Sequence, residues 1–309
     1  MTALDFGPVV LGGNVFGWTT DREEGFRVLD AFVDGGGRSI DTADVYVAWI
    51  PGNSGGESET IIGEWLASRK RRDDVVIATK VASLAARKGL SAANIEAAAE
   101  DSLRRLQTDR IDLYFAHQDD PDVPQEEVLT AFDRLVQAGK VREIGASNFS
   151  AERLRSAAAI ASSEGLTPFT VAQDQWSLVE RAAEIELVPT LDELGIAEIP
   201  YSSLASGFLT GKYRPGATSD SARAGKAGAY LDDPRNVDLL AALDDVAADH
   251  STSVTAIALA WLAAQRTVAA PIASARTTEQ VADLLAAGRV RLTPQDVEQL
   301  SAATEPVSG

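Results

Sequence analysis

The chain has 309 residues, no cysteine and a formal net charge of −18 at pH 7. The lack of cysteine excludes disulfide bonds, thiolate catalysis and cysteine-bound zinc, and the acidic surplus argues against nucleic acid or an anionic membrane as a partner. Because no apolar run approaches the roughly 20 residues needed to cross a bilayer, and the first residues have neither the basic start nor the apolar stretch of a signal peptide, we expect a cytoplasmic protein.

Strand-like and helix-like segments alternate along the chain, which predicts parallel βαβ units. The apolar runs expected to form strands cover residues 9–12, 39–43, 75–81, 111–117, 141–147, 169–173, 196–201 and 268–273. The segments expected to form helices cover residues 21–34, 57–70, 92–106, 126–138, 151–162, 184–194, 237–249, 254–265 and 278–287. Gly139 and Gly195 follow two of these helices, where a left-handed residue commonly ends a helix. Eight strands, with no linker or repeat between them, predict a single α/β domain over residues 1–309, a (β/α)8 TIM barrel.

One connection is much longer than the others. It runs from 202 to 235, after the seventh strand, and is rich in Gly, Ser, Lys and Arg. Connections of this length without regular structure are usually lids, binding loops or disordered segments. We therefore expect an insertion here, with residues 225–230 placed to cover a binding site.

Four polar residues lie on or just after predicted strands: Asp41, Tyr46, Lys80 and His117. A TIM barrel gathers its chemistry at the carboxyl ends of its strands, so these side chains are expected to meet. Together they can deliver a proton to a carbonyl oxygen that is being reduced by hydride. Free tyrosine titrates at about pH 10, so the ammonium of Lys80 is expected to lower the pKa of Tyr46. Asp41 would then fix Lys80, and His117 would orient the carbonyl or donate to the developing oxyanion.

Taken singly, each of these residues also has a structural explanation. A loop tyrosine often packs half-buried, a lysine at a strand end extends to solvent, an aspartate caps a turn, and a lone histidine is usually structural. His250, near the end of a predicted helix, is interpreted in that way. The joint position of four such residues at strand ends is what favours a catalytic site.

At these positions the chain resembles the aldo-keto reductases, and the resemblance extends over essentially its whole length. Residues 40–46 (Ile-Asp-Thr-Ala-Asp-Val-Tyr) match the family's Asp-Thr-Ala…Tyr segment. Residues 56–59, 78–80 and 114–117 match the loop that follows it, the family's lysine and its histidine. The resemblance implies that Tyr46 is the acid, that Lys80 and Asp41 tune it, and that His117 lies at the substrate oxygen.

The same resemblance implies NADPH or NADP+ as the cofactor, bound in an extended pose without a Rossmann fold. In agreement, residues 12–17 do not satisfy the dinucleotide fingerprint. The implied cofactor contacts are Ser147, Asn148, Gln173, Trp176, Tyr201, Ser202, Leu204, Ser206, Gly207, Lys212, Ser274, Arg276 and Gln280. The first three positions hold the nicotinamide carboxamide in the family, and Trp176 stands where a tyrosine usually stacks under the nicotinamide. Residues 201–212 resemble the pyrophosphate segment, with Ser203 in place of the usual proline.

The segment after the eighth strand indicates which dinucleotide is bound. Arg276 precedes a predicted helix, where an arginine adds a bidentate donor to backbone amides that already favour an anion. A ribose 2′-phosphate needs such a site, so Arg276 favours NADP over NAD; a solvated arginine is the alternative. Leu284 stands where the family often has an asparagine for adenine. Because the protein is acidic overall, local positive groups must hold an anionic cofactor.

Trp18 and Trp49, on loops after the first and second strands, are candidates for the wall of a substrate pocket, although both positions also suit surface packing. The leading hypothesis is NADPH-dependent reduction of an aldehyde or ketone by a protein that the resemblance leaves monomeric. The alternative is a catalytically idle NADP(H)-binding redox sensor or regulatory subunit. A metal-dependent hydrolase or isomerase is a third hypothesis, because Asp119, Asp120 and Asp122 follow His117. A hard metal, however, needs carboxylates that converge from several strands.

Overall fold

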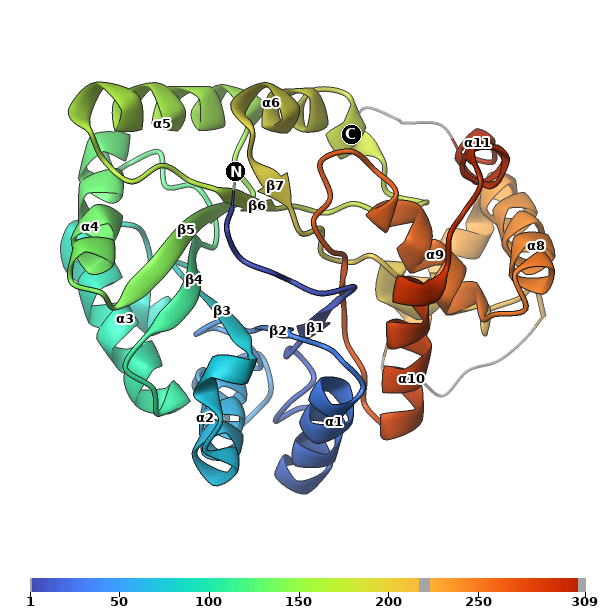
Figure 1. Ribbon diagram of the computed structural model, residues 1–309, viewed down its shortest axis with the longest axis horizontal. Coiled ribbons are helices and arrows are strands. Elements are labelled where there is room, and N and C mark those ends of the chain that lie inside the picture. Colours follow the sequence, from blue (N-terminus) through green and yellow to red (C-terminus); the bar gives the residue numbers. More distant parts are fainter. Residues whose placement is uncertain (1, 217–222, 305–309) are drawn as a thin grey trace.

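The computed structural model describes residues 2–216 and 223–304, which form parallel strands surrounded by helices (Figure 1). The strands are β1 (Val10–Gly12), β2 (Ser39–Asp41), β3 (Val76–Val81), β4 (Ile111–Ala116), β5 (Val141–Ser147), β6 (Val171–Gln173), β7 (Ala197–Glu198) and β8 (Ile272–Ala273). Their order in the sheet is β7-β6-β5-β4-β3-β2-β1-β8.

Backbone hydrogen bonds join the two outer strands of this sheet. Glu198 donates to Thr267 O at 2.8 Å, Ala269 donates to Glu198 O at 2.8 Å, and Ile272 donates to Pro200 O at 2.9 Å. These bonds close the sheet into a ring. The predicted (β/α)8 barrel is therefore confirmed.

The helices are α1 (Arg22–Asp34), α2 (Glu57–Arg69), α3 (Ala92–Leu106), α4 (Gln125–Gln137), α5 (Ala151–Glu164), α6 (Leu187–Leu194), α7 (Ala224–Gly228), α8 (Pro234–Asp249), α9 (Val254–Ala263), α10 (Thr278–Ala286) and α11 (Pro294–Ala302). Three helices have a side-chain N-cap: Asp21 for α1, Ser150 for α5 and Ser253 for α9. Each side-chain oxygen accepts a hydrogen bond from the backbone N–H three residues further on. Gly195 ends α6 in the left-handed conformation, and Gly139 adopts it after α4, as predicted.

Four helices differ from the prediction by three residues or more. α7 lies within the expected insertion and was not predicted, and α8 begins at Pro234 rather than at 237. α6 begins at Leu187 rather than at 184, because Pro189 suits the first turn of a helix and not its interior, and residues 182–184 form a 3-10 turn instead. α11 was not predicted, although Thr293 and Asp296 form a capping box and Pro294 occupies the first turn. These are standard start signals of a helix, so α11 could have been predicted from the sequence.

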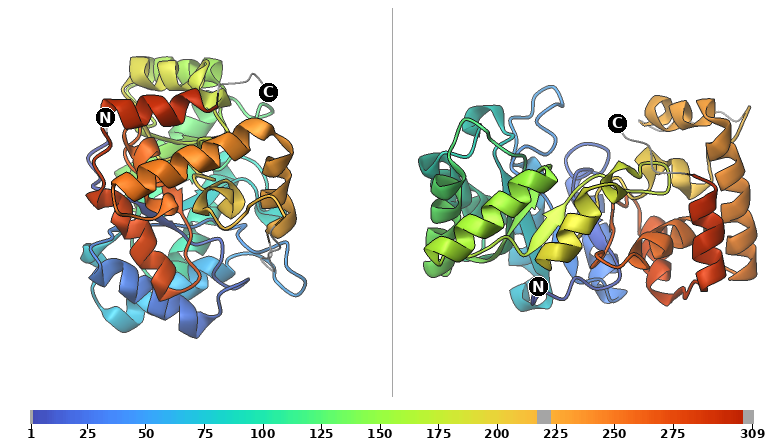
Figure 2. Two further views of the ribbon diagram at one scale, coloured as in Figure 1. Left: turned by 90° about the vertical axis from the view of Figure 1, so that its right-hand side faces the viewer. Right: turned by 90° about the horizontal axis from the view of Figure 1, so that it is seen from above.

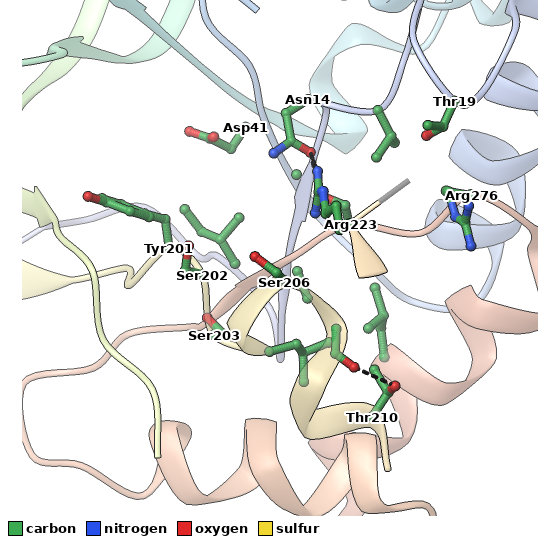
Figure 3. A pocket seen from close by; sticks show the side chains of 18 of the residues that line it. Asn14, Thr19, Asp41, Tyr201, Ser202, Ser203, Ser206, Thr210, Arg223 and Arg276 are labelled. Atoms are coloured by element: carbon green, nitrogen blue, oxygen red, sulfur yellow. Dashed lines mark hydrogen bonds between the residues drawn. The ribbon is translucent and has the colours of Figure 1, made fainter. Parts of the chain in front are cut away.

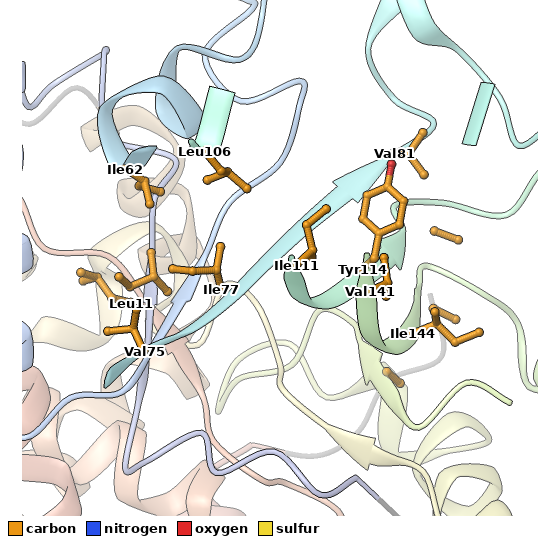
Figure 4. Close-up of a cluster of buried hydrophobic side chains, with 14 of the residues drawn as sticks. Leu11, Ile62, Val75, Ile77, Val81, Leu106, Ile111, Tyr114, Val141 and Ile144 are labelled. Carbon is orange, nitrogen blue, oxygen red and sulfur yellow. The ribbon is translucent and has the colours of Figure 1, made fainter. Parts of the chain in front are cut away.

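The strands are packed on both faces. Between strands and helices, the cluster in Figure 4 includes Leu11, Ile77 and Val81, which are fully buried. The alternate residues of the strands fill the interior of the ring, where the buried cluster consists of Leu4, Phe6, Val10, Ala78, Leu113, Phe115, Val171, Ile199, Ala270 and Ile272. Gly145 of β5 faces this interior, and a Cβ there would lie 2.4 Å from the ring of Phe115. A filled interior leaves binding to the loops at the carboxyl ends of the strands.

A second helical layer lies on one side of the ring. α8 and α11 pack outside α9, away from the strands (Figures 1 and 2). The hydrophobic cluster that joins them includes Leu243, Ile257, Trp261 and Leu300. Among the described residues, no helix is both long and apolar enough to cross a membrane.

The predicted insertion after β7 leads into this layer. Residues 205–210 form a 3-10 segment, and α7 is followed by a second 3-10 segment over residues 229–232. Residues 217–222 lie outside the described residues. Tyr230 ties the end of the insertion to the loop after β6, because its hydroxyl donates to Glu180 Oε1 at 2.6 Å.

Candidate active site

Lys80, Asp41 and Tyr46 form a hydrogen-bonded group at the carboxyl ends of β2 and β3. Lys80 Nζ donates to Asp41 Oδ2 at 2.7 Å, to the Tyr46 hydroxyl at 2.8 Å and to Thr42 O at 2.8 Å. The Tyr46 hydroxyl donates to Asp41 Oδ2 at 3.2 Å. All three N–H bonds of the Lys80 ammonium are therefore used, and its side chain is fully buried. The structure brings these three residues together in one fixed arrangement.

His117 follows β4 and faces Tyr46, with the two ring centroids 6.1 Å apart and the planes 75° from parallel. Burial, and then the charge of Lys80, lower the pKa of His117 to about 3. Its imidazole is therefore neutral at pH 7. Among the described residues, Nδ1 has no hydrogen-bond partner. A neutral imidazole can give a hydrogen bond to a bound molecule without carrying a charge into the site.

The pKa of Tyr46 differs from the expectation. Burial raises the pKa of Tyr46 well above its usual range, and the charge and hydrogen bond of Asp41 raise it further. Burial lowers the pKa of Lys80, although Asp41 opposes this shift. The expectation that the pKa of Tyr46 is lowered is therefore wrong, because desolvation and the Asp41 carboxylate raise it. Tyr46 remains a protonated phenol at neutral pH.

A cavity of about 1020 Å³ opens at the carboxyl ends of the strands. Of the predicted site residues, those that line it are Trp18, Asp41, Tyr46, Trp49, His117, Ser147, Asn148, Gln173, Tyr201, Ser202, Leu204, Ser206, Gly207, Lys212, Ser274, Arg276 and Gln280. In Figure 3, Asp41 and Tyr201 lie at one end of the view and Arg276 at the other, with Ser206 and Arg223 between them. The predicted catalytic and cofactor positions thus share one cavity, and Lys80 lies directly behind its wall.

A group of hydrogen-bonded side chains, here called the amide corner, lies beside Asp41 and consists of Ser147, Asn148, Gln173 and Tyr201. Gln173 Nε2 donates to Asp41 Oδ1 at 2.9 Å. Asn148 Nδ2 donates to Ser147 Oγ and to His117 O, both at 2.9 Å. Asn148 Oδ1 accepts the hydroxyl of Tyr201 at 2.8 Å. The amide corner is therefore hydrogen-bonded to Asp41 and to the backbone of His117.

Trp176 does not line the cavity. Its indole is buried, donates from Nε1 to Glu184 Oε1 at 2.9 Å, and meets the ring of Trp261 edge-on at 6.4 Å. This large side chain packs instead in the apolar cluster around α8 and α9, where full burial of its ring stabilises the fold. The aromatic ring that lines the cavity at the amide corner belongs to Tyr201.

Asn14 and Arg223 line the cavity, although neither was named from the sequence. Asn14 Oδ1 accepts a hydrogen bond from Arg223 Nη2 at 3.4 Å (Figure 3). It also accepts one from Ser274 Oγ at 2.8 Å. The Arg223 guanidinium lies 5.3 Å from the ring centroid of Trp18. Burial, and then the charge of Arg276, lower the pKa of Arg223. The basic composition of the insertion was the one signal for Arg223, which belongs to no motif.

Cationic side chains are concentrated in this cavity. Among the described residues that line it, the cations are Lys212, Arg223, Lys226 and Arg276. They contrast with the net charge of −18 of the whole chain. Two carboxylates, Asp41 and Asp283, also line it among these residues, and Asp41 is paired with Lys80, so the lining has a surplus of positive charge. Such a surplus attracts anions.

The backbone after β7 is strained where it borders the cavity. Ser202, Ala205 and Ser206 have φ values of 57°, 47° and 58°, and Gly207 follows with 95°. The left-handed conformation costs a residue other than glycine about 1–2 kcal/mol, and such strain concentrates at functional sites. Turns of this kind gather backbone N–H groups into concavities that bind anions. Residues 202–207 are therefore suited to phosphate.

The aspartates that follow His117 already have partners. Asp119 accepts two hydrogen bonds from Arg153, at 2.7 and 2.8 Å, and Asp120 Oδ2 accepts the N–H of Leu90 at 2.8 Å. In the part of the chain that the structure describes, no group of three or more His, Cys, Asp or Glu side chains is placed to hold a metal ion. These contacts give Asp119 and Asp120 a structural role in the loop.

Asp44 is a buried carboxyl group near Lys80 and Tyr46, and its effect on stability can be measured. Among the described residues, no side chain gives its carboxyl oxygens a hydrogen bond, and burial, followed by the charge of Glu59, raises its pKa to about 7. Between about pH 4 and pH 7 the folded protein therefore binds more protons than the unfolded chain, so stability falls as pH rises through that range. We expect Asp44→Asn to raise the melting temperature by several degrees at pH 8 and by less at pH 5. A difference that does not grow with pH would show that the Asp44 carboxylate is compensated.

Comparison with known proteins places this site in a family. The model of the aldo/keto reductase family matches residues 8–305. The chain is 35% identical to YrpG of Bacillus subtilis (strain 168), named as an uncharacterized oxidoreductase, over 97% of this chain and 93% of that one. It is 30% identical to an NADP+ aryl-alcohol dehydrogenase of Phanerodontia chrysosporium, over 96% and 82% of the two chains. It is also 30% identical to norsolorinic acid reductase A of Aspergillus parasiticus, over 96% and 77%. The chain belongs to the aldo/keto reductase family of oxidoreductases.

Proposed function

We propose that this protein reduces an aldehyde or ketone to the alcohol by hydride transfer from NADPH, with Tyr46 as the general acid. The observation that carries the proposal is the bonded group of Lys80, Asp41 and Tyr46, whose phenol lines the same cavity as four cationic side chains. A relative named as an NADP+ aryl-alcohol dehydrogenase supports the same reaction class.

The cavity residues fit the two ends of NADPH. At the amide corner, Asn148 and Gln173 suit the nicotinamide carboxamide, because their side-chain oxygens can accept hydrogen bonds from its N–H groups. Tyr201, rather than Trp176, offers the ring that would stack on the nicotinamide. When bound there, NADPH supplies the hydride.

The other end of the cavity suits the phosphates. Residues 202–207 and Lys212 would hold the pyrophosphate through backbone N–H groups and one ammonium. Arg276 would pair with the ribose 2′-phosphate through its planar, bidentate guanidinium. Arg223, which contacts Asn14 and Trp18, would add its positive charge to those of Lys212 and Arg276 near the phosphates.

Tyr46 would supply the proton. As negative charge grows on the carbonyl oxygen, the proton moves from the phenol to that oxygen, and the phenolate left behind keeps the hydrogen bond from Lys80 at 2.8 Å. This bond stabilises the phenolate as it forms. Asp41 holds the ammonium in place, and neutral His117 donates a hydrogen bond to the same oxygen.

Trp18 and Trp49 are the proposed substrate wall. Both line the cavity, and their rings meet edge-on with centroids 6.1 Å apart. Trp49 is 53% exposed, which is unusual for so large an apolar side chain and is typical of a binding surface. The pair favours carbonyls attached to an aromatic or apolar group, and aromatic aldehydes therefore come first in a substrate panel.

A catalytically idle NADP(H)-binding subunit is the competing function. Such a protein needs the cofactor cavity but has no use for the acid. A buried ion pair such as Lys80–Asp41 contributes little net stability, so its retention together with Tyr46 favours an enzyme.

The experiment that tests the proposal is a fluorescence titration of the purified protein with NADPH and NADH, followed by an aldehyde panel at the nicotinamide absorbance. We expect tighter binding of NADPH and turnover of at least one aromatic aldehyde. Tight binding without turnover of any panel member would favour the idle subunit. No binding of either nucleotide would refute both functions.

A further inference from the structure

Two buried carboxyl groups, Asp174 and Glu198, lie behind the amide corner and are not used by the proposed reaction. Asp174 directly follows Gln173 at the end of β6, and Glu198 ends β7; they are 7% and 1% exposed. Glu198 Oε1 accepts the backbone N–H of Asp174 at 2.9 Å. Asp174 Oδ1 accepts the backbone N–H of Asn148 at 2.9 Å, and Asp174 O accepts that of Tyr201 at 2.9 Å. Asp174 therefore joins the ends of β5, β6 and β7.

Asn148 is the residue that this arrangement constrains. Its φ is 58°, a left-handed conformation that costs a residue other than glycine about 1–2 kcal/mol. Such a conformation persists only where its surroundings over-determine it, and the carboxyl group of Asp174 holds the N–H of this residue. The backbone of Asn148 in turn sets the direction of its amide side chain.

The hydrogen bonds that Asn148 already forms determine which of its side-chain donors and acceptors are available to a bound molecule. Both N–H bonds of Nδ2 are used, by Ser147 Oγ and His117 O. Oδ1 accepts one hydrogen bond, from Tyr201, and a carbonyl oxygen has two lone pairs. The remaining capacity of Asn148 toward the cavity is therefore that of an acceptor, which matches an N–H of a carboxamide.

We propose that Asp174, supported by Glu198, is a positioning residue for the cofactor: it fixes the left-handed backbone of Asn148 and so presents Asn148 Oδ1 as an acceptor to the nicotinamide carboxamide. This inference rests on the proposed NADPH site. The role requires a hydrogen-bond acceptor at Asp174, and it does not require a negative charge.

The electrostatics agree with a role that depends on an acceptor rather than on a charge. Burial raises the pKa of Asp174 to about 7, and burial together with the charge of Asp174 raises the pKa of Glu198 well above its usual range. Glu198 Oε2 has no hydrogen-bond partner among the described residues. Both shifts disfavour the charged forms of the two carboxyl groups. Asparagine, which resembles the neutral acid and keeps the acceptor oxygen, should replace Asp174 with little loss.

The test compares ligands that do and do not contain the nicotinamide. We expect Asp174→Ala to raise the Kd for NADPH about tenfold, which corresponds to about 1.4 kcal/mol, and to leave the Kd for adenosine 2′,5′-bisphosphate within twofold. Asp174→Asn should keep both values within about threefold of wild type. The loss in Asp174→Ala should shrink for the 3-acetylpyridine analogue of NADPH, which lacks the carboxamide N–H.

Asp133→Ala is the matched control. Asp133 Oδ1 likewise accepts hydrogen bonds from a loop, from the N–H and hydroxyl of Thr167 at 3.0 and 2.6 Å. That loop precedes β6, at the end of the strands opposite the cavity, so this variant should change neither Kd.

A double-mutant cycle tests whether Asp174 acts through Asn148. In an Asn148→Ala background, Asp174→Ala should cause no further loss of NADPH affinity. Should Asp174→Ala not fold, Asp174→Ser, whose side chain is shorter than that of aspartate, takes its place. An equal loss for NADPH and adenosine 2′,5′-bisphosphate would overturn the positioning role, as would a loss in Asp174→Asn equal to that in Asp174→Ala. A wild-type protein that binds no NADPH would instead refute the proposed function.

Discussion

Replacing Tyr46 with phenylalanine is expected to lower kcat by about 10²–10⁴-fold, the usual contribution of a general acid. The change removes the hydroxyl that accepts from Lys80 and donates to Asp41, and it keeps the ring. The Kd for NADPH should stay within threefold, because the cofactor contacts proposed here lie at the amide corner and among the cations. Steady-state kinetics with the best aldehyde of the panel and a fluorescence titration measure the two quantities.

Tyr114→Phe is the matched control for this prediction. Tyr114 lies on β4 with its ring 5.4 Å from that of Phe132, and its buried hydroxyl has no hydrogen-bond partner among the described residues. Removal of that hydroxyl should leave kcat unchanged. If Tyr46→Phe kept more than about a tenth of the wild-type rate, Tyr46 would not be the acid and the proton would have to come from elsewhere in the cavity.

The meeting of Asp41, Tyr46, Lys80 and His117 could be predicted because the barrel has a simple geometry. Each residue lies at the end of a short apolar run, and parallel strands in a closed ring present all their carboxyl ends at one mouth. No long-range information beyond the order of strands is needed for this inference. Ser147, Asn148 and Gln173, which the family resemblance implied, also lie at strand ends and line the same cavity.

Three features could not be predicted in this way, because each depends on packing between distant segments. Trp176 is withdrawn from the cavity by a cluster that includes Trp261, a contact that strand order does not reveal. Arg223 reaches the cavity from an insertion without a motif. The raised pKa of Tyr46 reflects how deeply the fold buries it beside Asp41, whereas the sequence shows only that Lys80 is near.

Arg276→Ala is expected to raise the KM for NADPH by about 10–100-fold and to leave the KM for NADH within threefold. The range corresponds to hydrogen bonds to a charged group of about 1.5–3 kcal/mol. The backbone N–H of Arg276 donates to Gln280 Oε1 at 2.8 Å, which fixes the start of the segment. Within the described residues, its guanidinium forms no salt bridge, so it is available to the 2′-phosphate, the one group that separates NADPH from NADH. Steady-state kinetics with each nucleotide at a saturating aldehyde concentration provide the measurement.

Arg266→Ala separates this local effect from a general change in charge. Arg266 is a surface residue with a side chain that is 83% exposed and paired with Asp192, and it does not line the cavity. The Arg266→Ala variant loses the same charge as Arg276→Ala and should leave both KM values unchanged.

The preference for NADPH in the wild type should also weaken as ionic strength rises, because an arginine–phosphate pair at the cavity wall is screened by salt. If Arg276→Ala raised both KM values equally, Arg276 would hold a part common to both nucleotides, and the selection of NADPH would fall to Arg223, the neighbouring cation whose pKa already responds to it.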